Sequence, residues 1–231
     1  MKKLFTIGLL LVVFYSKGQF FSESQEWIGF YSSFSGKKIQ IKSDFQARWK
    51  DNFGQWKNFL FRIGVRKQYR FPKGGIGYFS AGPAFFFASA DGRPVFYPEF
   101  RLWQEGGLES THLKFPSALR LRVEERWISN SEGEFNYFTR LRLKTEISRR
   151  IGLKKNPDSK TAFLFSNEIL FQHNHQLGFY PEHDRISLGF QFYFLNELGF
   201  QFQYTIMPFV RTNSSQYEKR QVFRLNLLLD L

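Results

Sequence analysis

Residues 39–49 read IQIKSDFQARW, and apolar and polar side chains alternate along them. Five of the six odd positions are apolar, whereas the even positions hold Gln40, Lys42, Asp44, Gln46 and Arg48. A period of two is typical of a β-strand with one apolar and one polar face. The same alternation returns in three further segments, 135–147, 186–194 and 198–206. No stripe of helical period follows residue 18, so the pattern predicts an all-β chain.

The alternating segments predict a meander of strands that are joined by short turns. They lie near 25–34, 38–50, 56–70, 75–88, 97–106, 115–128, 135–149, 161–172, 184–195, 198–209 and 219–231. Gly, Pro, Asn and Asp residues fill most of the gaps, as expected of turns. His173–Asp184 is expected to form an outer loop, and Asn196-Glu197 a tight turn. Because no linker or change of composition interrupts residues 19–231, they are expected to form one domain.

Alternation fits either a soluble β-sandwich or a membrane barrel, and the polar face favours the barrel. Arg and Glu dominate that face, as in Arg120, Arg122, Glu124 and Arg126, whereas a sandwich exterior is more mixed. Several predicted strands have 12–15 residues, which suits a tilted membrane strand better than the usual soluble strand of about 5–6. The sequence therefore predicts an antiparallel up-and-down transmembrane β-barrel.

Both the aromatic residues and the C-terminal segment support this interpretation. Trp49, Trp56, Trp127 and Phe135 fall at strand ends, where an interfacial aromatic girdle would lie. The last strand alternates to the final residue and is expected to be the assembly signal that the outer-membrane assembly machinery reads; its apolar residues are Phe223, Leu225, Leu227, Leu229 and Leu231. An exposed apolar edge of this kind would promote aggregation in a soluble protein.

The number of strands is a difficulty for this prediction. The alternating segments give eleven, whereas single-chain bacterial barrels have even numbers. We therefore expect 10 or 12 strands, with 12 favoured, and one strand missed or lying outside the wall.

Residues 1–18 have the layout of a secretory signal peptide. Lys2 and Lys3 precede an uncharged apolar stretch, 4–15, and Ser16-Lys17-Gly18 places small residues before the expected cleavage site. The apolar stretch is too short for a comfortable spanning helix, although an N-terminal anchor helix is the alternative. The chain has no cysteine, which excludes a lipoprotein anchor and a disulfide framework. A cell outer membrane of Gram-negative type is the expected location.

The composition limits the possible partners. Lys and Arg number 33 against 20 Asp and Glu, which gives a formal net charge of +13, and aromatic residues make up 20% of the chain. This aromatic content argues against disorder. Nucleic acid is an unexpected partner for an exported chain despite its charge. The expected partners are outer-membrane lipid and, during biogenesis, the assembly machinery, with the mature chain a monomer.

The mature chain also resembles a family of outer-membrane barrels of unknown function from Bacteroidetes-type bacteria, domain of unknown function 2490. The resemblance rests on four segments: Glu26-Trp27-Ile28-Gly29, Phe61-Arg62-Ile63-Gly64-Val65-Arg66, Arg140-Leu141-Arg142-Leu143-Lys144 and Asp184-Arg185-Ile186-Ser187-Leu188-Gly189. The family carries no established activity, so the resemblance implies a fold and a compartment but no catalytic residues.

Inside a barrel, the polar faces of the strands would form a charge network that faces the lumen. Its expected members are Arg62, Arg66, Glu99, Arg101, Arg120, Arg122, Glu124, Arg126, Arg140, Arg142, Lys144, Glu146 and Glu168. Like charges directly opposite would repel, so a register that pairs Glu124 with Arg140 is needed. The network either fills a small barrel with mutually neutralising groups or leaves a narrow lumen with an excess of Arg, which favours anions.

The hypotheses of a catalytic site and of a metal site both depend on the histidines. His173, His175 and His183 are expected in one outer loop, where they form a weak candidate metal site. No G-x-S-x-G motif occurs, and no strand histidine accompanies Ser43 or Ser117. We therefore expect no enzymatic activity, no catalytic residues, no cofactor and no metal.

The expected function is that of an integral outer-membrane barrel, structural or porin-like with a narrow polar passage. Two alternatives remain open at this point. One is an outer-membrane lipid-modifying enzyme that uses outer-loop His residues, and the other is a soluble periplasmic β-barrel that binds an apolar ligand.

Overall fold

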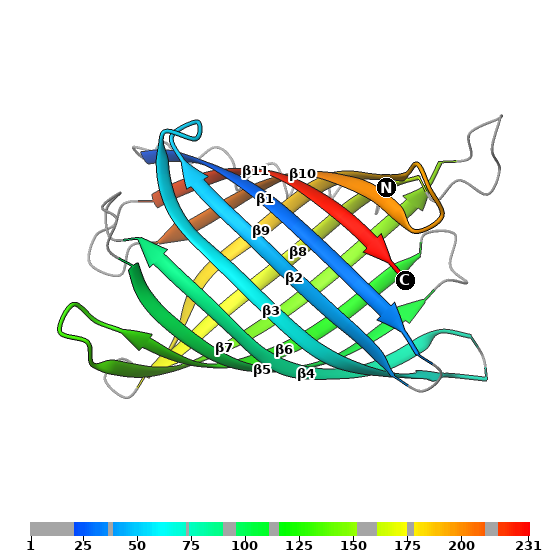
Figure 1. Ribbon diagram of the computed structural model, residues 1–231, viewed down its shortest axis with the longest axis horizontal. Coiled ribbons are helices and arrows are strands. Elements are labelled where there is room, and N and C mark those ends of the chain that lie inside the picture. Colours follow the sequence, from blue (N-terminus) through cyan, green and yellow to red (C-terminus); the bar gives the residue numbers. More distant parts are fainter. Residues whose placement is uncertain are drawn as a thin grey trace, which may run out of the picture.

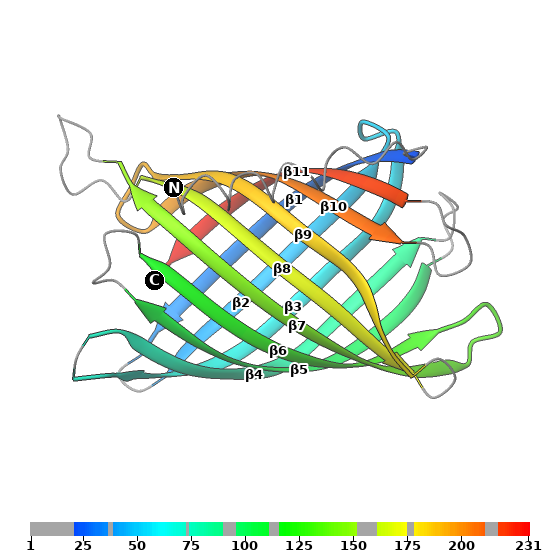
Figure 2. The ribbon, with the colours of Figure 1, turned by 180° about the vertical axis from the view of Figure 1, so that it is seen from behind.

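The computed structural model is a closed β-barrel (Figures 1 and 2). It describes residues 21–36, 39–72, 74–89, 96–110, 116–151, 161–174, 178–210 and 217–231. The expected signal peptide, residues 1–18, lies outside the described residues. Within those ranges, no helix has the length and apolar content needed to cross a lipid bilayer. The all-β prediction is confirmed.

Each strand follows one of the alternating segments. The strands are β1 (Phe21–Ser35), β2 (Gln40–Lys50), β3 (Gln55–Arg70), β4 (Ile76–Ser89), β5 (Phe96–Ser110), β6 (Ser117–Ser129), β7 (Phe135–Arg150), β8 (Ala162–Asn174), β9 (Gly178–Tyr193), β10 (Leu198–Val210) and β11 (Tyr217–Asp230). They have 11 to 16 residues. Figures 1 and 2 show that the strands are steeply tilted relative to the barrel axis, as closure of a sheet into a barrel requires.

The barrel has eleven strands in the described residues, so the expected 10 or 12 was wrong. Strands that are neighbours in sequence pair antiparallel, and β1 closes the sheet by pairing with β11 in parallel, from Phe21↔Glu218 to Ser33↔Asp230. An odd number of hairpin-connected strands leaves the first and last strands pointing the same way. Parallel pairing satisfies the backbone groups of both edges, so closure does not demand an even number.

This closure separates the two ends of the described chain. Phe21 lies beside the start of β11, at the end of the barrel that we call the N-terminal mouth. Leu231 lies at the opposite end, the C-terminal mouth, where its backbone N–H donates to the carbonyl oxygen of Ser33 at 2.7 Å.

The expected outer loop His173–Asp184 was wrong. β8 continues to Asn174 and β9 begins at Gly178, so most of this segment belongs to the wall. The register between the two strands shifts between Leu170 and Phe171, where Glu182 has no partner. This bulge interrupts the alternation, which explains why the sequence pattern missed the first part of β9. The tight turn at Asn196-Glu197 is present between β9 and β10.

The two faces of the sheet differ in chemistry. Large apolar side chains point outward and are exposed, among them Phe61, Leu121 and Leu188 at 40%, 49% and 60%. The inward residues next to them in sequence are polar and buried, such as Arg122 at 4% and Ser187 at 6%. The barrel therefore has the reverse of a soluble core, because its apolar face is the outer one.

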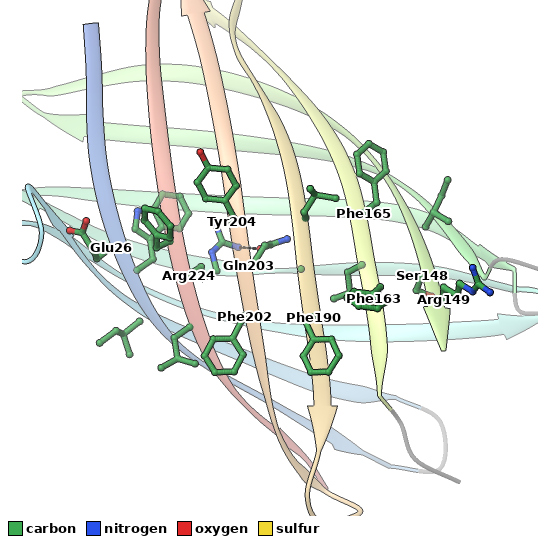
Figure 3. A pocket seen from close by; sticks show the side chains of 18 of the residues that line it. Glu26, Ser148, Arg149, Phe163, Phe165, Phe190, Phe202, Gln203, Tyr204 and Arg224 are labelled. Atoms are coloured by element: carbon green, nitrogen blue, oxygen red, sulfur yellow. Dashed lines mark hydrogen bonds between the residues drawn. The ribbon is translucent and has the colours of Figure 1, made fainter. Parts of the chain in front are cut away.

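Aromatic rings gather on the outer face near both mouths. At the N-terminal mouth, Trp49 contacts Trp56 with ring centroids 5.0 Å apart, and Trp127 contacts Tyr137 at 5.5 Å. Near the C-terminal mouth, Phe163 contacts Phe190 at 5.5 Å. Figure 3 shows this second group from close by, where it lines an apolar hollow across β8, β9 and β10.

Candidate functional site

The interior holds the charged face of the strands. The structure places every member of the expected charge network on the inward face: Arg62, Arg66, Glu99, Arg101, Arg120, Arg122, Glu124, Arg126, Arg140, Arg142, Lys144, Glu146 and Glu168. The alternation of side chains along a strand explains this arrangement, since every second residue lies on the same face. The outward positions of the same strands hold apolar residues, so the charged side chains share the inward face.

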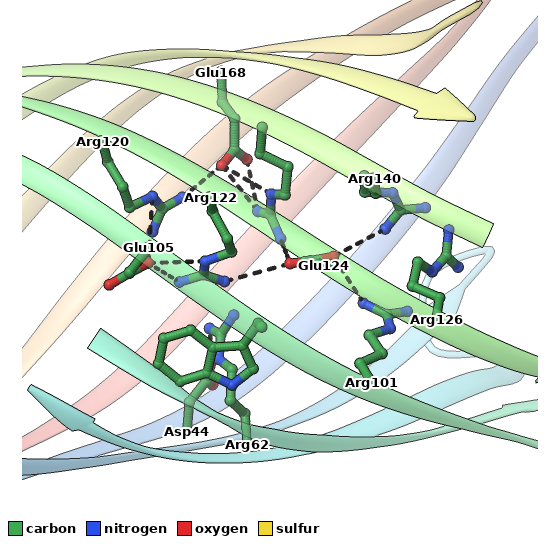
Figure 4. Close-up of polar contacts among 12 residues, drawn as sticks. Asp44, Arg62, Arg101, Glu105, Arg120, Arg122, Glu124, Arg126, Arg140 and Glu168 are labelled. Carbon is green, nitrogen blue, oxygen red and sulfur yellow. Dashed lines mark hydrogen bonds and ion pairs between the residues drawn. The ribbon is translucent and has the colours of Figure 1, made fainter. Parts of the chain in front are cut away.

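Glu124 is the centre of the network (Figure 4). Its carboxylate is 2% exposed and lies 2.7 Å from a guanidinium nitrogen of Arg142. The guanidinium groups of three further residues surround it, Arg122 at 3.5 Å, Arg140 at 3.6 Å and Arg101 at 3.7 Å. The strand register sets Glu124 directly opposite Arg140, as the sequence argument required. A buried carboxylate needs such compensation, because desolvation of an unpaired charge is costly.

The register also sets two like charges opposite each other, Arg122 on β6 and Arg142 on β7. Each guanidinium turns to a carboxylate on the strand at its other side. Arg122 donates to Glu105 on β5 at 2.5 Å, and Arg142 donates to Glu168 on β8 at 2.9 Å. Repulsion between the two cations is therefore offset by carboxylates on the flanking strands.

Further ion pairs tie distant strands together. Arg120 on β6 reaches across β7 to Glu168 on β8 at 2.5 Å. Other pairs join neighbouring or next-but-one strands, or residues two apart on one strand, among them Arg101–Glu99, Arg126–Glu99, Arg140–Glu182, Arg66–Glu109, Arg62–Asp44 and Lys144–Glu146. Much of the interior is thus filled by groups that neutralise one another, as in other small barrels.

Tyr31, Arg62, Arg120 and Arg122 lie between the two cavities of the lumen, and we call these four side chains the partition; the ring of Trp103 packs along the inner wall beside two of them. Trp103 on β5 is 5% exposed and lies against Gly64 on β3. A Cβ atom at Gly64 would sit 2.2 Å from Trp103 Cζ2, so only glycine leaves room for the ring there. The guanidinium carbons of Arg122 and Arg62 lie 4.9 and 5.7 Å from the ring centroid, within the range of cation–π attraction.

Two cavities lie on either side of this partition. The larger, about 360 Å³, lies toward the N-terminal mouth, and the smaller, about 300 Å³, toward the C-terminal mouth. Tyr31, Arg62, Arg120 and Arg122 belong to the walls of both cavities. These four side chains therefore lie between the two cavities.

Sequence reasoning missed several residues of the larger cavity. Trp27, Arg48, Arg185 and Arg224 all lie in its wall. A signal for three of them was available, because Arg48, Arg185 and Arg224 alternate with outward residues on their strands. Trp27 gave less signal, since an aromatic residue in a barrel strand is usually expected to face outward.

Glu26 and Trp27 are neighbours in sequence, and their side chains lie on opposite faces of β1. Trp27 points into the lumen among the arginines. Glu26 faces the other way and accepts a hydrogen bond from the backbone N–H of Phe53 at 3.0 Å. That bond holds the β2–β3 turn, in which Asp51, Asn52 and Phe53 all have positive φ angles of 55° to 64°.

The structure does not bring the histidines into one loop. His173 lies near the end of β8, His183 lies within β9, and His175 lies outside the described residues. His183 belongs to the wall of the larger cavity, where its Nε2 accepts a hydrogen bond from Arg185 Nε at 3.0 Å. Among the residues with described positions, no group of three His, Cys, Asp or Glu side chains could hold a metal ion.

The apolar residues of the C-terminal strand lie on the outer face. Phe223 and Leu231 are 54% and 57% exposed. Val222 precedes this row and Asn226 lies within it; both face inward and are 0% exposed. The expected assembly signal, Phe223, Leu225, Leu227, Leu229 and Leu231, therefore forms one apolar row along β11 and the residue after it.

The geometry and charge of the interior can hold a small anion. The described wall of the larger cavity includes the carboxylates of Glu146, Glu168 and Glu182 and a much greater number of Arg and Lys side chains. In a low-dielectric interior, such an excess of fixed cations attracts counter-anions strongly. It also repels cations of similar size.

Comparison with known proteins agrees with the resemblance drawn from the sequence. A family model described as a protein of unknown function, DUF2490, matches residues 25–218. No curated protein and no solved structure matches the chain. Since the family model covers most of the chain, including nearly all of the barrel wall, the chain belongs to the DUF2490 family of proteins of unknown function.

Proposed function

We propose that this chain is an integral outer-membrane barrel that forms a narrow polar passage favouring small anions. One observation carries the proposal: the exposed outer face is apolar, while the interior is charged and has an excess of cations. Lipid would cover the outer face, and small ions would enter the interior.

The outer face supports insertion into a bilayer. Strands of 11 to 16 residues meet or exceed the ~9–11 that a tilted strand needs to cross the hydrocarbon. The aromatic contacts near both mouths, such as Trp127–Tyr137 and Phe163–Phe190, are placed as girdles at two interfaces would be. An exposed apolar surface of this extent would aggregate in water.

The outer membrane is the membrane that fits best. Residues 1–18 have the pattern of an export signal, and the apolar row that ends at Leu231 has the pattern that the assembly machinery reads. We further propose that the mature chain is a monomer, with lipid as its main partner.

The interior supports passage of ions and argues against an apolar ligand, because charged and polar side chains, Arg above all, make up most of its wall. Passage requires movement of the partition, and we expect a low conductance for that reason. A purely structural role is the second candidate. The contacts of Arg62 and Arg122 with the buried Trp103 ring favour it, since a partition that is held in place would block the lumen.

We propose that the chain acts without a catalytic step or a cofactor. The position of His183 supports this, because it faces the lumen beside Arg185 and not a lipid leaflet. Unchanged membrane lipids in a deletion strain are the expected result, and a specific loss of one lipid species would contradict it.

Two measurements test the proposal. Membrane fractionation and heat-modifiable migration on detergent gels should place the folded protein with outer-membrane barrels; recovery in the soluble periplasm would refute the location. In planar bilayers with a KCl gradient, the reversal potential should show preference for chloride over potassium. Preference for potassium would contradict the anion passage, and absence of any conductance would favour the structural role.

A further inference from the structure

The larger cavity contains a cluster of cations around one indole ring, formed by Trp27, Arg48, Arg185 and Arg224, which we call the Trp27 cluster. Trp27 is 3% exposed. The guanidinium carbons of Arg48, Arg224 and Arg185 lie 3.9, 4.4 and 5.9 Å from the centroid of its ring. These residues come from β2, β11 and β9, so three separate strands direct a positive charge at the same place.

Two of these arginines have only neutral hydrogen-bond partners. Arg48 Nη2 donates to Gln46 Oε1 at 2.7 Å, and Arg224 Nη1 donates to Gln203 Oε1 at 3.2 Å. Within the part of the chain that the structure describes, neither forms an ion pair with a carboxylate, and the Nε atom of each is buried without a hydrogen bond. Both guanidinium groups therefore retain donors that an anion could use.

The carboxylates in the wall of the cavity are engaged elsewhere. Glu146 pairs with Lys144 at 2.6 Å, and Glu182 pairs with Arg140 at 2.5 Å. Glu168 bonds most closely to arginines other than those of the Trp27 cluster, and its distance to Arg185 is 3.4 Å. Glu168 therefore compensates Arg185 in part, whereas the charges of Arg48 and Arg224 have no matching carboxylate among the described residues, which is unfavourable in a buried site.

We infer that the Trp27 cluster is a binding site for a soluble oxyanion, such as phosphate, sulfate or the carboxylate of a small solute. Guanidinium groups bind such anions through paired N–H donors, and the indole ring holds the guanidinium groups in place by cation–π attraction. The site lies inside the wall, so a lipid headgroup on the outer face cannot reach it. The inference rests on the proposed function, since it names the solute class of the proposed passage.

Calorimetric titration of the folded protein in neutral detergent micelles tests this site. Sodium phosphate or sodium sulfate is added at constant ionic strength, with chloride as the balancing anion, so that simple screening stays the same throughout. We expect saturable binding of phosphate and of sulfate. Arg48→Gln and Arg224→Gln should each weaken it by about tenfold or more, because each removes a charge-assisted contact.

Arg149→Gln is the matched control. Arg149 lies on the outer face near the end of β7, so its variant loses the same charge without altering the cavity. Binding should be unchanged in this variant. Heat-modifiable migration reports whether each variant is folded. Arg48→Lys, which keeps the charge but loses the paired donors, replaces Arg48→Gln where the latter fails to fold and should also bind more weakly.

The outcomes separate this site from the passage. The site is refuted if the wild-type protein shows no saturable binding, or if folded Arg48→Gln and Arg224→Gln proteins bind phosphate as tightly as the wild type does. Chloride-selective conductance together with that result would leave the passage intact. Conversely, phosphate binding that depends on Arg48 and Arg224 in a protein without conductance would keep the site and refute the passage.

Discussion

Placing a charge on the middle of the outer face would measure what that face contacts. Leu143 is near the centre of the 16-residue strand β7 and is 39% exposed. Its strand partners are Leu121 on β6 and Ile169 on β8, which are 49% and 37% exposed on the same face. An arginine at this position would have apolar neighbours on both adjacent strands, and the carboxylate that follows in this row is Asp184, one strand further away on β9.

In a bilayer, an outward Arg near the midplane costs about 2–4 kcal/mol. We therefore expect Leu143→Arg to lower the folding equilibrium constant roughly 30- to 900-fold. Phe135→Arg, at the first position of β7 and 57% exposed in the wild type, serves as the control for depth. It should cost about 0–1 kcal/mol, because the bilayer interface tolerates the charge.

Urea unfolding in lipid vesicles, followed by tryptophan fluorescence and gel migration, gives both values. If the outer face contacted water, both substitutions would change the free energy of unfolding by about 0.5 kcal/mol or less. Equal and small effects at Leu143 and Phe135 would refute the membrane orientation.

Four further predictions concern the interior and the closure of the barrel. Glu124→Gln should cost about 3–5 kcal/mol in urea unfolding, because it leaves four buried guanidinium groups without their shared carboxylate; a loss below 1 kcal/mol would contradict its central role. Gly64→Ala should cost about 1–3 kcal/mol by displacing the Trp103 ring, and the penalty should shrink when Trp103 is also replaced by Ala. Trp103→Ala alone should raise single-channel conductance in planar bilayers, and an unchanged conductance would mean that the ring does not limit passage. Finally, Phe30→Cys combined with Leu227→Cys should form a disulfide on mild oxidation, since these residues are partners in the parallel pair; failure to cross-link would argue against closure of β1 on β11.

Local alternation was enough to predict most of the wall. Eight strands lie within two residues of their expected bounds, because apolar and polar residues alternate along most of each; they are β2, β3, β4, β6, β7, β8, β10 and β11. The inward position of the charged side chains followed from the same alternation. The expected bounds were four residues short at the start of β1 and at the end of β5. The largest error was in β9, where the bulge at Glu182 shifts the inward and outward positions by one.

The strand number could not be derived from local pattern at all. Alternation indicated eleven segments. We nevertheless expected an even number of strands, because other single-chain barrels have even numbers. Whether β1 pairs with β11 depends on how the whole sheet curves, and that is a property of the closed chain.

The contacts between side chains on the inner face were likewise beyond the sequence. Alternation along a strand can show that Trp103 and Gly64 both face inward. It cannot show that a ring on β5 reaches across β4 to a glycine on β3. The same holds for Trp27, whose neighbours come from β2, β9 and β11. Such convergence depends on barrel diameter and stagger, which alternation does not encode.

The parallel seam between β1 and β11 has a practical consequence for topology. Because Phe21 and Leu231 emerge at opposite mouths, the two tails of a membrane-inserted barrel would face different aqueous compartments. A protease or thiol reagent confined to the cell exterior would then reach a label at one tail and spare a label at the other. An even-stranded barrel would expose both labels or neither, so one accessibility measurement on intact cells would report both orientation and parity.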